Sequence, residues 1–219
     1  MNNVLKFFSI FFILILNFHT VQATKIEDGA TVVVMDFGTH PGAVEADLAL
    51  KNAEKTTSEY VIYKLLQHDK YVVMERDTVN SKLKQANLNT ISIIDPNTAK
   101  QIGELLKAKY LIYGNVIDLS LSNTGVDIAN GIGSSVKVDT VIARIVVRMM
   151  NTETGEIIAA VKGEGKSKKS FTNVGSPQIG YFFIGTEKVT QDSVHNALQK
   201  AAFDSVEKLT KNLMKGEIN

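Results

Sequence analysis

The sequence contains no cysteine and no tryptophan, and only 3 of its 219 residues are proline. The missing cysteine excludes disulfides, thiolate metal sites, a cysteine nucleophile and a lipid-bearing N-terminal cysteine. Three prolines are too few for a proline-rich linker. What remains is 44% hydrophobic and 21% charged, which is typical of a globular protein rather than a disordered chain or a multi-span membrane protein.

An excess of charge of one sign is also missing. Lys and Arg number 24, Asp and Glu number 23, and Lys6 is the only one of these charges in the first 23 residues. Residues 24–219 therefore carry 23 charges of each sign. A neutral chain lacks the cationic face that displaces counterions from a phosphate backbone, so nucleic acid is not expected as a partner.

The first 23 residues have the pattern of a cleaved secretory signal peptide. After Lys6, residues 7–16 form an apolar run about half as long as the ~20 residues of a membrane-spanning helix. Val-Gln-Ala follows at 21–23, so cleavage is predicted between Ala23 and Thr24. An uncleaved anchor is the alternative. The expected mature chain, residues 24–219, is an exported single domain with a sizeable core.

Hydrophobic periodicity predicts the fold class. Apolar runs at 31–37 and 71–74 are typical of buried strands, and residues 44–67 predict a long helix whose polar centre could break it. Asp77 and Asp95 are expected to cap the next two helices. Later elements are strands at 110–121, 136–150 and 156–168, a turn at 151–155 and an amphipathic helix from about 190 to 215. We expect a single three-layer α/β domain with a mixed sheet, parallel early and antiparallel late, and a C-terminal amphipathic helix.

The predicted strand at 136–150 changes its apolar side part-way. Val136 and Val138 are apolar at even positions, whereas from Val141 onward the odd positions are apolar. Because side chains alternate along a strand, this change predicts a bulge or sharp twist near residues 139–141.

No stretch of the sequence assembles a catalytic or cofactor site. Residues 160–167 resemble a phosphate-binding loop, but they lie inside a strand pattern with no helix after them. Glu75 and Asp77 flank Arg76, which is more typical of a helix start with a local ion pair than of an acid–base pair. The histidines after the leader lack metal-ligand spacing: His40, His68 and His195. We expect no enzyme activity, no metal and no cofactor. An exported hydrolase would need His40 or His195 to face a carboxylate.

Three stretches follow one another in a recognisable order. They are Tyr-Val-Val-Met-Glu-Arg-Asp at 71–77, a helix with Gly103 leading through Ala-Lys-Tyr into a strand with Gly114 at 99–116, and a strand, an Asn-Thr-Glu-Thr-Gly-Glu turn and a return strand at 145–157. Together they resemble the curli production assembly/transport component family (CsgG-type). The resemblance covers roughly residues 30–213.

The resemblance implies an outer-membrane secretion component. Such proteins export amyloid subunits through a ring of identical chains, in which each chain gives β-hairpins to a shared transmembrane barrel and keeps its α/β domain in the periplasm. The implied partners are further copies of the chain, other envelope or secreted proteins, and the outer membrane. Domains of this kind also serve as soluble periplasmic scaffold or binding modules without a pore, which is the alternative function.

The inserted hairpins are expected in the polar or irregular segments 122–135 and 166–189. A barrel strand needs ~9–11 residues, so the first segment is short unless the flanking strands extend into it. The membrane or partner contacts expected in the second segment are Phe171, Val174, Ile179, Tyr181, Phe182 and Phe183. In a scaffold module, Tyr181–Phe183 would instead be a docking patch.

The chain departs from the family pattern at two places. The lipidated cysteine of the family is absent, so we expect an exported, periplasmic protein that is associated with the outer membrane but is not a lipoprotein. The family's channel constriction, a loop after the first strand, carries Tyr and Asn-Phe. Residues 38–53 contain no Tyr, and no gate residue is assigned here.

Overall fold

The structure, a computed structural model, describes residues 29–44, 53–88, 95–128, 134–176, 180–184 and 191–215. The predicted cleavage site at Ala23 and Thr24 lies outside these residues. In chain order the elements are β1 (Ala30–Val34), β2 (Gly38–Thr39), α2 (Ala53–Leu65), β3 (Tyr71–Val73), α3 (Arg76–Gln85), α4 (Pro96–Leu106), β4 (Tyr110–Ile128), β5 (Ser134–Asn151), β6 (Ile157–Ser176), β7 (Gly180–Ile184) and α5 (Gln191–Lys215).

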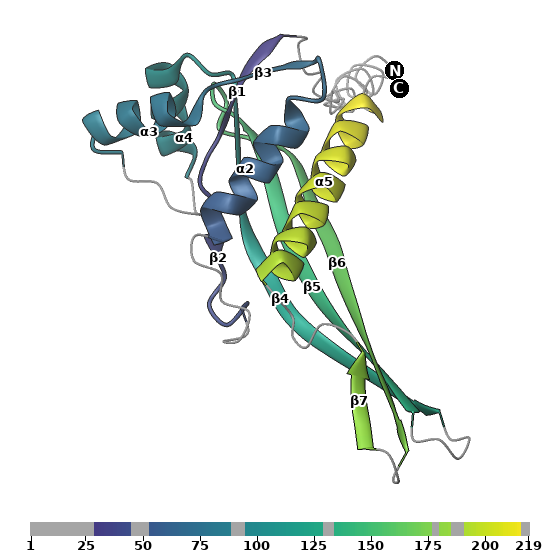
Figure 1. The fold of residues 1–219 in the computed structure, drawn as a ribbon. Coiled ribbons are helices and arrows are strands. Elements are labelled where there is room, and N and C mark those ends of the chain that lie inside the picture. Colours follow the sequence, from purple (N-terminus) through teal and green to yellow (C-terminus); the bar gives the residue numbers. More distant parts are fainter. Residues whose placement is uncertain are drawn as a thin grey trace, which may run out of the picture.

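The strands form a single mixed sheet in the order β3-β1-β4-β5-β6-β7, with β2 pairing beside β4 (Figure 1). β1 is parallel to β3 and β4, whereas the pairs β4–β5, β5–β6 and β6–β7 are antiparallel. The predicted α/β class, with parallel pairing early and antiparallel pairing late, is therefore confirmed.

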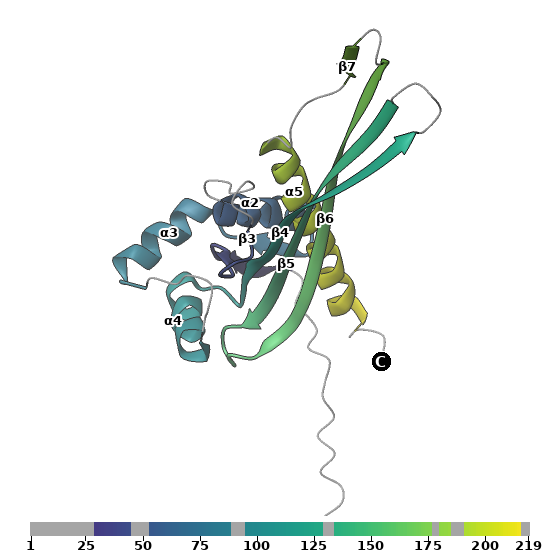
Figure 2. The same cartoon turned by 90° about the horizontal axis from the view of Figure 1, so that it is seen from below.

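Helices cover both sides of the sheet and make three layers, as Figure 2 shows with α4 and α5 on opposite sides. Alternate residues of β1 point to the two sides. Val32 and Val34 pack in the core under α2 and α5, and Val33 packs in the core under α3 and α4. The predicted apolar stripe of α5 lies in the first of these cores: Val194, Leu198, Ala202, Val206, Leu209 and Leu213. None of the helices in the described ranges combines the length and apolarity needed to cross a bilayer.

Local capping explains where two helices start. Asp95 accepts hydrogen bonds from the backbone of Asn97 and Thr98 at 3.0 and 3.1 Å, as its predicted capping role requires. The prediction that Asp77 caps α3 is wrong. Glu75 is the cap and accepts from Asp77 N–H and Thr78 N–H at 2.8 and 2.7 Å. These hydrogen bonds lower the pKa of the exposed Glu75 carboxyl group.

The predicted helix at 44–67 is shorter than expected. Val44 forms a parallel bridge with Leu119, so it belongs to the sheet, and α2 ends at Leu65. The polar centre does not break α2, because its hydroxyls have partners. Ser58 Oγ donates to Glu54 O at 2.8 Å and accepts from Phe37 N–H at 3.1 Å. A polar residue of α2 thus accepts a hydrogen bond from the loop after β1.

The bulge predicted near residues 139–141 is absent. The register of β5 runs without a shift from Ser134 to Arg144 against β4, and from Ser135 to Met149 against β6. The irregularities lie between Val116 and Asp118 in β4, and beside Met150. The change of apolar side in β5 therefore has another cause than a slip in register.

The stretch that resembles a phosphate-binding loop is part of β6, as its strand pattern predicted. Its glycines allow a helix to approach closely. A Cβ atom on Gly163 would lie 2.8 Å from Ser205 Cβ, and one on Gly165 would lie 2.8 Å from Lys200 Cβ; each would also meet a backbone carbonyl oxygen of α5. The missing side chains of these glycines therefore allow α5 to pack directly against β6.

Candidate assembly surface

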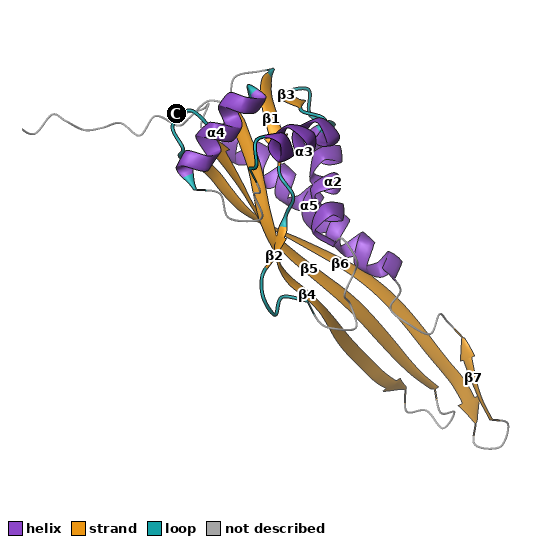
Figure 3. Cartoon of the chain, turned by 90° about the vertical axis from the view of Figure 1, so that its left-hand side faces the viewer, coloured by secondary structure: helices purple, strands orange, loops and turns teal. Residues whose placement is uncertain are grey.

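The sheet continues well past the helices. Figures 1 and 3 show β4, β5 and β6 running together beyond the helical layers, with β7 added at their far end. We call the part formed by residues 120–128, 134–142, 166–176 and 180–184 the extension. The segments 122–135 and 166–189, which are polar or irregular in sequence and in which inserted hairpins are expected, thus contain paired strands within their described residues. Strand β4 runs to Ile128, and β5 resumes at Ser134.

The extension reverses the apolar alternation of the sheet. From Val141 at the border of the extension to Met149 in the domain, the odd-numbered residues of β5 are apolar and buried: Val141, Ala143, Ile145, Val147 and Met149. In the extension the odd positions 137 and 139 are Lys and Asp, and the even positions 136 and 138 are Val. Since the register of β5 against β6 does not shift between them, the apolar positions move to the other side of the same sheet.

The register arranges residues of the extension in rows across the strands. One row is Val126, Val136, Thr172 and Ile184. The next is Gly125, Lys137 and Phe171. The row of Thr124, Val138 and Ser170 follows, and after it comes the row of Asn123, Asp139 and Lys169. Apolar and β-branched residues therefore alternate, row by row, with rows that contain charges.

The register also separates the contact residues predicted from the sequence. Val174 pairs with Phe182, in phase with the Val136 row. Phe171 pairs with Lys137, and Phe183 pairs with Asn173, in phase with the charged rows. Tyr181, paired with Gly175, is in phase with Phe183. Ile179 lies outside the described residues.

A ladder of ion pairs marks the border between the domain and the extension. Arg144 of β5 binds Asp118 of β4 and, at 2.8 Å, Glu164 of β6. Lys166 Nζ reaches the other oxygen of Glu164, also at 2.8 Å. The hydrogen bonds from Lys166 and then Arg144 lower the pKa of Glu164 to about 2. Glu164 is therefore ionised at neutral pH, and its ion pairs and that of Asp118 link three strands where the helical cover ends.

A second ion-pair cluster lies inside the domain. Arg76 is 7% exposed and binds Asp36 in the loop after β1 and Glu59 of α2, the latter at 2.8 Å. It also donates to Lys55 O at 3.1 Å. Burial lowers the pKa of Arg76. The predicted local ion pair with the neighbouring carboxylates is wrong, since Arg76 joins three elements that are distant in sequence.

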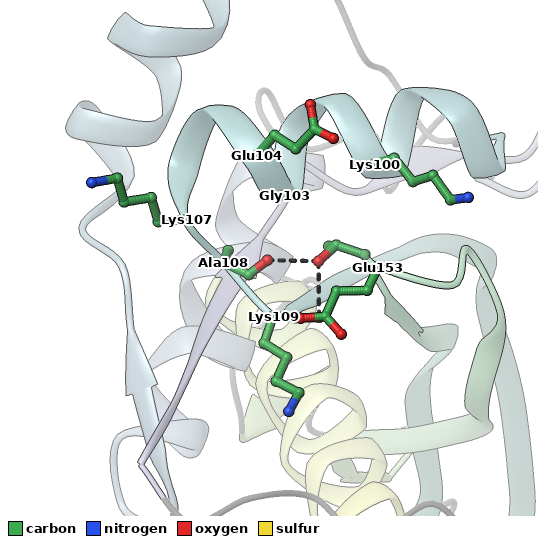
Figure 4. Close-up of a pocket in the computed structure, with 8 residues that line it drawn as sticks. Lys100, Gly103, Glu104, Lys107, Ala108, Lys109 and Glu153 are labelled. Atoms are coloured by element: carbon green, nitrogen blue, oxygen red, sulfur yellow. Dashed lines mark hydrogen bonds between the residues drawn. The ribbon is translucent and has the colours of Figure 1, made fainter.

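An open cleft of about 510 Å³ lies between α4 and the β5–β6 turn (Figure 4). Thr152 fills its floor: a Cβ atom on Gly103 would lie 3.0 Å from Thr152 Cγ2, and the Thr152 hydroxyl is 2.6 Å from Ala108 O. Figure 4 shows Lys100 and Lys107 pointing away from each other, so the cations of the cleft do not converge. The cleft therefore lies where α4 packs against the β5–β6 turn, which belong to two of the three recognisable motifs.

The side chains required for a hydrolase do not come together in the described residues. His195 Nδ1 is 3.1 Å from Tyr60 Oη, and His40 Nδ1 is 3.0 Å from Pro41 O. No group of three metal-ligating side chains occurs within the described ranges. The main feature of the described residues is therefore the extension, in which apolar and charged positions fall on opposite sides of the strands and ion pairs mark the border with the domain.

The family model for the curli production assembly/transport component CsgG matches residues 15–219. The chain belongs to the CsgG family. The match spans the domain and the extension alike, so the resemblance of the three motifs is confirmed over nearly the whole chain. No match was found among curated proteins.

Three bacterial proteins are among the solved structures that are similar to this chain. The LpoB C-terminal domain from Escherichia coli is 17% identical, covers 66% of this chain and 87% of its own, and has a TM-score of 0.44. Lipoprotein GNA1162 from Neisseria meningitidis is 12% identical, with coverages of 64% and 83% and a TM-score of 0.45. The PelC dodecamer from Paraburkholderia phytofirmans is 11% identical, with coverages of 83% and 92% and a TM-score of 0.36.

Proposed function

We propose that this CsgG-family chain is a subunit of a curli-type protein-export channel in the outer membrane. Copies assemble into a ring, and the extension of each copy becomes part of the channel wall. Family membership supports a role in assembly or transport. The observation that carries the proposal is the extension, a set of paired strands beyond the helices in which the apolar alternation changes sides.

A change of surroundings explains this alternation. In the domain, α5 covers one side of β5, so the odd positions there are apolar. In a membrane-crossing wall, lipid would lie on the opposite side and a water-filled lumen on the side of the odd positions. Val136 and Val138 would then meet lipid, and Lys137 and Asp139 would meet water. β5 needs no bulge, because the strand continues unchanged and only the surroundings of its two sides differ between the domain and the membrane.

Ring formation would follow from the two outer strands of the extension. β4 lies at one edge of the extension and β7 at the other. A strand edge presents unpaired backbone groups, and a neighbouring copy can pair with them. Pairing β7 of one copy with β4 of the next is a head-to-tail contact, which closes into a ring when the rotation between copies allows it.

A soluble periplasmic scaffold or binding module is the second candidate function. The observation that favours it is the length of β7, which has 5 residues where a membrane-crossing strand needs ~9–11. In this function Tyr181–Phe183 would be a docking patch for another envelope protein. Neither function requires catalytic chemistry or a cofactor.

Sizing the purified protein tests the proposal. The protein is extracted from membranes and measured by sedimentation, with detergent and without it. We expect most of the chain in the membrane fraction and one large, uniform species in detergent. A strict monomer in both conditions, with no membrane-bound fraction, would contradict the channel and favour the scaffold.

A further inference from the structure

The outer edge of β4 is covered by other parts of the sheet along the domain. β1 and β2 pair with it as far as Val116. Beyond them, Leu119 N–H donates to Ala43 O at 2.6 Å, and Val44 bridges Leu119. From Ser120 to Ile128, no described strand pairs on this side of β4.

The outer edge of β6 is covered by side chains rather than by a strand. Three residues of α5 bind its backbone, and we call them the edge guard. Lys208 Nζ donates to Lys162 O at 3.0 Å, Asp204 Oδ2 accepts from Glu164 N–H at 2.9 Å, and Lys200 Nζ donates to Lys166 O at 2.9 Å. The Lys208 ammonium also binds Asp204 at 2.6 Å, which holds the guard together.

Helix and strand geometry explain how the guard fits. Four residues along a helix advance about 6 Å, and two residues along a strand advance about 6.6 Å. The guard residues are four apart in α5, and their targets are two apart in β6. In an edge strand, alternate residues direct both backbone groups outward. The guard therefore follows the outward-facing backbone groups of β6.

The two covers end at almost the same level of the sheet. The cover on β4 ends at Leu119, in the row Leu119, Ala143 and Gly165. The cover on β6 ends at Lys166, in the adjoining row Ser120, Ile142 and Lys166. The covers described on the two edges thus end at neighbouring rows of the sheet.

We propose that the edge guard confines strand pairing between copies of this chain to the extension. Unpaired strand edges are templates for further strands, and natural sheets block them with charged side chains, especially lysine. A second copy that approached β6 along the domain would have to displace the guard, and its two ammonium groups and one carboxylate would lose their hydrogen bonds to the β6 backbone. The guard ends at Lys166, so pairing between copies starts beyond that residue. The copy-to-copy contact rests on the proposed function; the blocking of the edge does not.

The charges around β6 also favour one orientation of the copies. Lys162 and Lys166 of the strand lie beside Lys208 and Lys200 of the helix, and within this cluster Glu164 and Asp204 carry the opposite charge. Two β6 edges facing each other would bring these lysines together, and like charges repel. The contact between β6 or β7 and β4 is free of this repulsion, which suits a head-to-tail ring.

The test compares a guard variant, Lys200→Ala/Asp204→Ala/Lys208→Ala, with a control, Gln199→Ala/Lys211→Ala. Both sets lie on α5, and each lowers the net charge by one. Two quantities are measured: hydrogen exchange at the Glu164 amide, and the size distribution in detergent. For the guard variant we expect exchange at least about tenfold faster and a broad, concentration-dependent set of larger species. The control should match the unmodified chain in both.

The proposal is overturned if the guard variant keeps the exchange rate at Glu164 and the size distribution of the control. If the triple variant melts earlier than the control, Lys200→Met/Lys208→Met takes its place, because methionine keeps most of the stem and removes the donor. Failure of the ring would show differently: the unmodified chain would stay monomeric in detergent, while the guard variant would still self-associate through its opened edge.

Discussion

Replacing Gly165 with valine should lower the free energy of unfolding by about 3 kcal/mol or more, through overpacking. Gly165 lies under α5, where a Cβ atom would meet the carbonyl oxygen of Ala197 and lie 2.8 Å from Lys200 Cβ. Backbone atoms cannot rotate away as a side chain can, so α5 must shift as a whole. For a domain of this size we expect the melting temperature to fall by about 6–12 °C, measured by circular dichroism.

The matched control for this substitution is Ala160→Val. Residue 160 lies on β6 as well, but it is exposed. Valine suits strands and meets no helix there, so the melting temperature should change by less than about 2 °C. If Gly165→Val also melts within about 2 °C of the unmodified protein, then close packing of α5 on the two glycines of β6 is not what holds this helix in place.

Replacing Val136 with aspartate should remove the chain from the membrane while leaving the domain folded. A charge on the lipid-facing side of a membrane strand costs up to about 2 kcal/mol for an acidic residue, and every copy in a ring carries the same change. We expect at least a tenfold fall in the membrane-bound fraction, measured by flotation. The melting temperature of the domain should stay within about 2 °C, because position 136 lies beyond the helices.

Ser135→Asp is the matched control, since it adds the same charge one residue away on the same strand. Position 135 is in phase with the charged rows, so the proposed wall places it toward water, and membrane binding should be nearly unchanged. Equal loss in both variants would mean that any added negative charge weakens membrane binding. No loss in either would mean that the extension does not contact lipid.

Elements with local signals were predictable from the sequence. The cap of α4 needs only Asp95 and Pro96 in succession, and the stripe of α5 needs only helical spacing. The hydrophobic run of β1 indicated burial on both sides, which Val32 and Val33 confirm at 0% exposure. In each of these the physical cause lies within a few residues of its effect.

The strands of the extension had no such signal. Ser122, Asn123 and Thr124 are exposed and polar, a composition typical of a loop. They are strand residues because β5 pairs with them, and pairing is a property of the sheet rather than of the segment. The reversed alternation in β5 predicts a bulge or sharp twist, because a slip in register and a change of surroundings leave the same pattern in the sequence.

Long-range contacts were equally hidden. Arg76 was expected to pair with adjacent carboxylates, yet its partners Asp36 and Glu59 are 40 and 17 residues away. The edge guard could not be predicted, because it depends on α5 lying over the edge of β6. A hint was present in Gly163 and Gly165, two glycines at strand spacing, which allow another element to approach a sheet closely.

Cysteine scanning across residues 135–139 of β5 tests the central claim most directly, because the chain has no cysteine of its own. Five single-cysteine variants are placed in membranes and treated with a charged thiol reagent, and denatured samples supply the intrinsic rates. The account predicts alternation: Val136 and Val138 positions at least about tenfold slower than Ser135, Lys137 and Asp139. Equal rates at all five positions would contradict a wall with lipid on one side and water on the other.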